Sequence, residues 1–261
     1  MKYTNKKKQK RNYSSKSNKQ KTKKKKKQIG GRETNSIFFK GKLPSDETIA
    51  KRIKVKGMSK KKVMEQVDMI KKYHLSFNPK KWNNDIFNMK AHNCYSYFLN
   101  KQHPLIRYDC KKTYQKYGKY KNGKLNTSEY IPCGKPQPGA HAGLPRVKKN
   151  KYTCKNMNKR ILTDNPSIRK TTMKKGCKTH EYMGAMVIQP NETYHFYRRD
   201  NDGLWSHKKG ATPITRYDAV GKLISDPEKS NRNFGELNYS EFCHHYCIPN
   251  NPNKKHSSLY V

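Results

Sequence analysis

The chain has 261 residues, and its 60 Lys and Arg against 18 Asp and Glu give a formal net charge of +42, which predicts partners that carry negative charge. No stretch approaches the roughly 20 apolar residues that a membrane-spanning helix needs. No apolar segment follows the basic N-terminus, so we expect neither a membrane span nor a secretory signal peptide.

Positive charge is most concentrated at the N-terminus. Residues 1–28 hold 13 Lys, one Arg and no acidic residue, and they end in the run Lys23, Lys24, Lys25, Lys26 and Lys27. Because nothing apolar recurs there, we expect residues 1–32 to form a disordered polybasic arm. The arm is expected to bind a polyanion, DNA or RNA, by counterion release without reading bases. A solvated tail or a localisation signal is the alternative.

Residues 33–80 are expected to form a basic helical extension. Ser45 can cap a first helix, and Ser59 can cap a second helix with apolar residues four and three apart on one face. The other face of the second helix carries lysines. The pattern fits either a helix pair that contacts DNA or an extension docked through its narrow apolar stripe, and we favour docking.

From residue 81 the chain changes character, and aromatic residues, cysteines and turn dipeptides recur. We expect an α+β domain over residues 81–249, with helices first and a hairpin sheet after them, followed by a tail over residues 250–261. Apolar residues at 194–197 are typical of a strand. Asp200-Asn201-Asp202-Gly203 predicts a hairpin turn, and residues 204–207 predict the return strand.

Cys94 is a candidate nucleophile because of its place in the sequence. Polar residues precede it, and Tyr95, Phe98 and Leu99 follow at helical spacing. Cys94 is therefore expected in the first turn of a helix, where unpaired N–H groups lower the pKa of a thiol. A cysteine that is simply buried is the alternative.

Two histidines on the expected hairpin could serve such a thiol. His195 and Tyr197 fall on one face of their strand, and Phe196 falls on the other. His207 lies twelve residues after His195 on the return strand, so the two imidazoles can meet across the hairpin. One imidazole can then take the thiol proton while the second fixes its tautomer. A structural or surface role is the alternative.

The run Asn93-Cys94-Tyr95-Ser96-Tyr97, followed by a strand His and by a second His twelve positions later, resembles the NlpC-like branch of the papain-fold cysteine hydrolases. The resemblance spans roughly residues 82–249 and implies a papain-like core. It implies that Cys94 is the nucleophile, His195 the general base and acid, and His207 the orienting group, with the Cys94 N–H holding part of the oxyanion. The composition rich in Lys and Asn resembles that of giant-virus proteins.

Six further cysteines leave two states open. They are Cys110, Cys133, Cys154, Cys177, Cys243 and Cys247. They could form three disulfides that leave Cys94 as the free thiol, or they could stay reduced in the core. The Cys243-to-Cys247 spacing could offer metal ligands, but no second pair matches it, so neither a metal nor a cofactor is expected.

Two hypotheses for the function follow. The first is a papain-like hydrolase of an amide or ester bond, with an unknown peptide or acyl substrate and a polyanion-binding arm. The second is a nonenzymatic, basic component of a virion or nucleoprotein that binds DNA or RNA by charge. The reactivity of Cys94 and its approach to His195 distinguish the two hypotheses.

Overall fold

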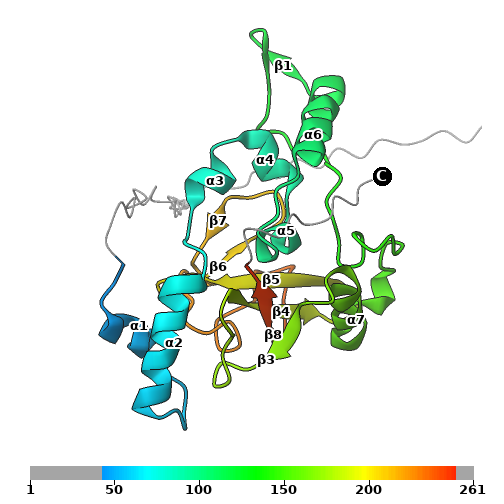
Figure 1. The fold of residues 1–261 in the computed structure, drawn as a ribbon. Helices are drawn as coiled ribbons and strands as arrows, with labels where there is room; N and C mark the ends of the chain where they lie inside the picture. The colour runs from blue at the N-terminus through cyan, green and yellow to red at the C-terminus, as the bar shows by residue number, and fades with distance from the viewer. Residues whose placement is uncertain (1–42, 251–261) are drawn as a thin grey trace, which may run out of the picture. The chain divides into compact units, whose positions relative to one another are not determined.

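A six-stranded antiparallel sheet organises residues 43–250, which are the residues that the computed structural model describes (Figure 1). The strand order is β3-β8-β4-β5-β6-β7. The strands are β3 (Arg169–Thr171), β4 (Glu181–Gln189), β5 (Thr193–Arg199), β6 (Trp205–Lys208), β7 (Ile214–Thr215) and β8 (Glu241–Pro249). The C-terminal strand β8 therefore inserts between β3 and β4.

All seven α-helices of residues 43–250 precede this sheet in the chain. They are α1 (Asp46–Ile53), α2 (Lys60–Tyr73), α3 (Pro79–Asn83), α4 (Ile86–Ala91), α5 (Cys94–Phe98), α6 (Pro104–Tyr117) and α7 (Cys154–Asp164). A small hairpin of β1 (Tyr120–Lys121) and β2 (Lys124–Leu125) follows α6, and a 3₁₀ turn, η1 (Lys149–Lys151), precedes α7. The predicted α+β class is confirmed.

Some predictions concern residues that lie outside this range. The polybasic arm over residues 1–32, with Lys23 to Lys27, is one of them, and residues 251–261 of the expected tail are another. Between residues 43 and 250, no helix is long and apolar enough to cross a bilayer.

The hairpin predicted around residues 200–203 is present. The backbone N–H of Asp200 donates to the Leu204 carbonyl at 2.8 Å, and Gly203 has a φ of +84°, a value that favours glycine. The turn joins β5 to β6 in the register Tyr197 to His207. The strand assignments made from sequence in this region therefore agree with the structure.

The sheet buries a different cluster on each face. Along β4, Tyr182, Met186 and Ile188 enter a cluster with α5 and α7, whereas Met183, Ala185 and Val187 enter a second cluster with Trp205 and Tyr239. The alternation follows the period of two in a strand. Helix α5 packs closely against β4 at Gly184. A side chain at this position would clash with the Phe98 ring.

A β-bulge in β8 places its two cysteines on opposite faces. The pairing of β8 with β4 shifts between Met186 and Val187, so one extra residue of β8 intervenes. Cys243 consequently packs against the α5 and α7 cluster and bonds Cys154 at the start of α7. Cys247 is bonded to Cys177 on the other face.

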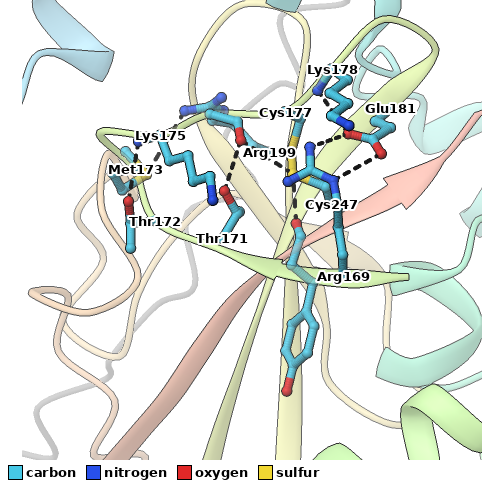
Figure 2. Close-up of a disulfide and its surroundings, with 12 residues drawn as sticks. Arg169, Thr171, Thr172, Met173, Lys175, Cys177, Lys178, Glu181, Arg199 and Cys247 are labelled. Atoms are coloured by element: carbon cyan, nitrogen blue, oxygen red, sulfur yellow. Dashed lines mark hydrogen bonds and ion pairs between the residues drawn. A yellow bond between two sulfur atoms is a disulfide. The ribbon is translucent and has the colours of Figure 1, made fainter. Parts of the chain in front are cut away.

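A further disulfide joins Cys110 of α6 to Cys133, and Cys94 is the free cysteine within residues 43–250. Of the two states left open by the sequence, the structure therefore has the one with three disulfides. Figure 2 shows the Cys177–Cys247 bond beside the ion pair of Arg169 with Glu181. Two of the disulfides attach a segment to β8 of the sheet, and the third attaches the loop at Cys133 to α6.

Helices α1 and α2 pack together and against the hairpin turn. Their facing residues form an apolar cluster of Ile49, Ile53, Met58, Val63, Val67 and Ile70. Arg52 donates to the carbonyl oxygen of Asp202 at 2.8 Å, and methyl groups of the two isoleucines of α1 lie against Gly203. The apolar stripe of α2 therefore packs against α1, and the pair contacts the hairpin turn through Arg52 and the two isoleucines of α1.

Candidate active site

Helix α5 begins at Cys94 because Asn93 caps it. The Asn93 Oδ1 accepts hydrogen bonds from the backbone N–H groups of Tyr95 and Ser96, both at 3.1 Å. The amide nitrogen of Asn93 donates to the carbonyl of Pro136 at 2.8 Å, which holds the loop after Cys133 against the start of the helix. Cys94 itself is buried, with 6% of its surface exposed.

A buried lysine fastens the chain just before this helix. The Nζ of Lys208 donates to three backbone carbonyls, those of Met89, Gly210 and Thr212, at 2.7 to 2.9 Å. Burial lowers the pKa of Lys208 to about 7. Met89 belongs to α4, which precedes Cys94 in the chain, and Lys208 is the last residue of β6. The side chain of Lys208 therefore links α4 to β6.

The Cys94 thiol lies against one edge of β5. The pairing of β5 with β6 ends at Tyr197, and the backbone N–H of Phe196, one residue further along, acts to lower the pKa of the Cys94 thiol. Phe196 packs in the same cluster as Cys94, on the face that α5 covers. The thiol is therefore next to the backbone of the strand that carries His195.

His195 points to the other face and contacts His207. The Nε2 of His195 lies 2.7 Å from the Nδ1 of His207, and the Nε2 of His207 lies 3.0 Å from the carbonyl oxygen of Tyr217. A carbonyl only accepts, so the Nε2 of His207 carries a proton. A neutral His207 then accepts at Nδ1, and His195 donates from Nε2. This chain leaves the Nδ1 of His195 unprotonated.

Burial keeps both imidazoles neutral. It lowers the pKa of His195 well below its usual value, and it lowers the pKa of His207 to about 4. The positive charge of Lys209 acts in the same direction on each ring. The tautomers deduced from the hydrogen bonds are therefore those present at neutral pH.

The expectation of a lowered thiol pKa is wrong. Burial raises the pKa of the Cys94 thiol to about 12, although the N–H groups of Phe196 and Tyr95 act in the opposite direction. The positive charge of Lys208 also acts to lower the pKa, but the desolvation of Cys94 within the cluster of α5 and β4 outweighs both effects. The resting thiol is consequently protonated.

The structure brings His195 and His207 together but puts Cys94 on the opposite face of β5, in the cluster that contains Phe196. The Tyr239 ring stacks on His195 with centroids 5.1 Å apart, on the face of the sheet away from α5. Within residues 43–250, no hydrogen bond joins Cys94 to His195 or His207. The direct approach of the sulfur to His195 remains a prediction.

Sequence reasoning missed Lys208 and Tyr239 as parts of this region. Lys208 adjoins His207 in the sequence, but nothing distinguishes it from the other lysines of so basic a chain. Tyr239 lies in an irregular segment before β8. Only the packing of that segment over the sheet brings its ring to His195.

A cavity of about 370 Å³ lies beside the start of α5. Pro136, whose carbonyl is held by Asn93, lines it together with Lys135 and residues of α6. Arg146 and Arg160 add positive charge to its wall, and Asp109 adds an acidic group. The cavity offers space for a ligand close to the helix that begins with Cys94.

The metal-ligand spacing of Cys243 and Cys247 does not form one site. Each sulfur is committed to a different disulfide, so the pair cannot bind one ion together. Two acidic neighbours, Glu241 and Glu181, approach these disulfides. A sulfur within a disulfide is not a thiolate ligand, so neither group offers a complete set of ligands in this state.

Comparisons with known proteins give one local similarity. No protein-family model matches the chain, and no solved structure matches it. A stretch of 52 residues, 20% of this chain, is 48% identical to the Insoluble matrix shell protein 1 of Ruditapes philippinarum. The match covers 35% of that protein, so the chain spans about a third of the relative's length.

Proposed function

We propose that this chain is a papain-like cysteine hydrolase that cleaves an amide or ester bond. Cys94 is the nucleophile, His195 the general base and acid, and His207 the orienting group. The hydrogen-bond chain from Tyr217 through His207 to His195 carries the proposal, because it leaves the Nδ1 of His195 as a proton acceptor.

Three further observations support this assignment. Cys94 is the free thiol within the described range, and it stands at a capped helix start. It packs in the same cluster as Phe196, the residue after His195. The Tyr239 ring stacks on His195 with centroids 5.1 Å apart and so supports the position of that imidazole.

The reaction follows from these roles. As the sulfur attacks the carbonyl carbon, the S–H proton passes to the Nδ1 of His195, and the developing oxyanion is stabilised partly by the Cys94 N–H. The C–N or C–O bond then breaks, and His195 returns the proton to the leaving group. Water hydrolyses the resulting thioester with His195 again acting as base, which restores the thiol and releases the acid.

The raised thiol pKa determines how the first step proceeds. An ion pair of thiolate and imidazolium is not the resting state, because burial disfavours both charges. Proton transfer therefore accompanies attack and requires the neutral imidazole. The rate constant for alkylation should rise with pH only in the acidic range, below the usual histidine pKa, and then level off.

Alkylation of the disulfide-bonded protein by iodoacetamide tests the proposal. Cys94 is then the target among the described cysteines, and mass spectrometry follows the modified peptide. The His195→Ala variant should slow alkylation at neutral pH by about 100-fold or more, the usual contribution of a general base. The His244→Ala variant, which changes a histidine of β8, a strand separated from β5 by β4, should alkylate within about twofold of the wild type.

Equal rates in the wild type and the His195→Ala variant would contradict the proposal. So would alkylation that occurs only when added urea begins to unfold the protein. A simple structural thiol with this pKa would behave in that way, because its thiolate fraction at neutral pH is very small.

A nonenzymatic role is the second candidate, and the charge distribution favours it. Residues 43–250 alone hold 41 Lys and Arg against 17 Asp and Glu. A scaffold with this charge would bind polyanions, and the similarity to a protein named for the insoluble shell matrix fits a structural role. The result for His195→Ala decides between the two candidates.

A further inference from the structure

The cavity of about 370 Å³ beside the start of α5 has no part in the proposed reaction. Its wall combines side chains of α6, the loop of residues 134–146 and Arg160 of α7. Small-molecule sites usually have volumes of about 300–1,000 Å³, so this cavity is large enough for a small ligand. The charge and polarity of its wall indicate which ligand it accepts.

Positive charge dominates this wall. Three cationic side chains line the cavity, those of Lys135, Arg146 and Arg160, against one carboxylate, that of Asp109. Within residues 43–250, none of the three cations forms an ion pair with an acidic side chain. The uncompensated charge favours a ligand that carries negative charge.

Arg160 is fixed in the wall and still has a donor to offer. Only 9% of its surface is exposed. Its Nε donates to the carbonyl of Pro138, and its Nη2 donates to that of Pro145. Its Nη1 forms no hydrogen bond within residues 43–250, and this atom is not fully buried. The N–H groups of Nη1 can therefore donate to a ligand in the cavity.

The loop that forms much of the wall is anchored at several points. The carboxylate of Asp164 accepts from the backbone N–H groups of Gly139 at 2.6 Å and Ala142 at 2.8 Å. The Cys110–Cys133 disulfide joins α6 to the residue that precedes the loop. A site that is held in place before its ligand arrives loses less entropy on binding.

Between its charged groups the wall is apolar. Ile106 of α6 and Pro136, Ala140 and Leu144 of the loop line the cavity. Apolar ligand surface that is buried against them contributes to affinity, whereas a bare inorganic anion would leave them in contact with water. The ligand should therefore have an apolar body as well as an anionic group.

We propose that this cavity binds a small organic carboxylate with an apolar body. Its carboxylate accepts from Arg160 and Arg146, because the planar guanidinium matches the two oxygens of a carboxylate. Its body packs against Leu144 and Pro136. Asp109 in the same wall disfavours a second negative charge, so a carboxylate fits better than a phosphate monoester, which carries nearly two. This inference is independent of the hydrolase reaction.

A nuclear magnetic resonance titration of the isotope-labelled full chain tests the assignment. At constant ionic strength, phenylpropionate should shift the amide signals of residues 134–146 and of α6, and should saturate them with a Kd of about 1 mM or tighter. Phenylpropanol lacks the charge and acetate lacks the body, so each should bind at least about tenfold more weakly. Phenyl phosphate should bind no more tightly than phenylpropionate.

Two variants with matched controls examine the charge and the space separately. Arg146→Gln should weaken the binding of phenylpropionate by about tenfold, whereas Lys148→Gln, which removes an exposed charge outside the wall, should change it less than about twofold. Leu144→Trp fills the cavity without changing its charge and should abolish binding. Leu237→Trp alters an exposed leucine outside the cavity and should leave binding unchanged.

Several results would overturn the proposal. Equal losses in Arg146→Gln and Lys148→Gln would show that the anion responds only to net charge. Signals that shift all over the basic surface without saturating, or tighter binding of phenyl phosphate, would contradict a carboxylate site. A circular dichroism melt verifies the fold of each variant, and if Leu144→Trp is destabilised, the exposed Arg146 still provides the test.

Discussion

The region around β5 and β6 and the surface of α6 use the same residue types in opposite ways. Lys208 is fully buried and gives its three ammonium protons to backbone carbonyls, whereas Lys112 is exposed above a tyrosine ring. Tyr97 is buried and hydrogen-bonded to Ser206, whereas Tyr108 faces water. Burial, and not residue identity, therefore decides whether a lysine or tyrosine forms hydrogen bonds inside the fold or is available to a partner.

The contrast extends to ion pairs. Asp200 is buried between Arg198 and Arg216, and it also accepts from the Ser206 hydroxyl at 3.0 Å. Burial raises the pKa of Asp200, and the two arginines act in the opposite direction. Glu129 pairs with Lys119 on the exposed surface, where the lysine is largely in water. The first network fixes the hairpin turn, and the second contributes little to the fold.

The largest expected effect comes from breaking the buried network. The Asp200→Ala variant leaves two arginines without their shared carboxylate, so it should lower the free energy of unfolding by about 3–5 kcal/mol. Urea unfolding followed by circular dichroism measures the change. Glu129→Ala removes a carboxylate from the exposed pair and should cost less than about 1 kcal/mol. Similar losses in the two variants would contradict the contrast drawn here.

These networks mark the limit of what the sequence predicts. The β5–β6 hairpin, the helix start at Cys94 and the facing of His195 and His207 depend on short-range patterns, and they could be predicted. The pairing of β8 between β3 and β4, with its bulge at Cys243, is a contact between distant segments. No local pattern specifies it, so neither the disulfide partners nor the position of Tyr239 could be predicted.

The raised pKa of the Cys94 thiol could not be predicted from the sequence either. The position of Cys94 in the first turn of a helix is local and was predicted correctly. Its burial depends on α5, β4 and the loop at Pro136, which meet only in the folded chain. Desolvation then outweighs the effect of the helix start, and the sign of the shift is reversed.

A smaller effect is expected from the lysine that ties α4 to β6. Lys208→Met leaves three carbonyls without their donor but also removes the cost of burying an ammonium, so the free energy of unfolding should fall by about 2 kcal/mol. The adjacent Lys209→Met is the control, because Lys209 is exposed. Its unfolding curve should match that of the wild type within about 0.5 kcal/mol. Unchanged stability in Lys208→Met would show that these carbonyls find water instead.

The last expected effect concerns the pH dependence of stability, which the buried histidines determine. Burial lowers the pKa of several histidines, and it lowers those of His92, His207 and His245 to about 4. Below about pH 6.5 these histidines bind protons in the unfolded chain but not in the folded chain, so acid favours unfolding. Each such histidine should lower stability by up to about 1.4 kcal/mol per pH unit until its folded pKa near 4 is reached.

His245 isolates this effect, because it lies outside the proposed catalytic group. Its ring packs against Trp205 and Phe242, and the charge of Arg199 adds to the effect of burial while that of Asp226 opposes it. In His245→Gln the slope of unfolding free energy against pH, measured by urea unfolding between about pH 4.5 and 6, should decrease by about one proton. An unchanged slope in His245→Gln would mean that burial of this ring does not set the pH response.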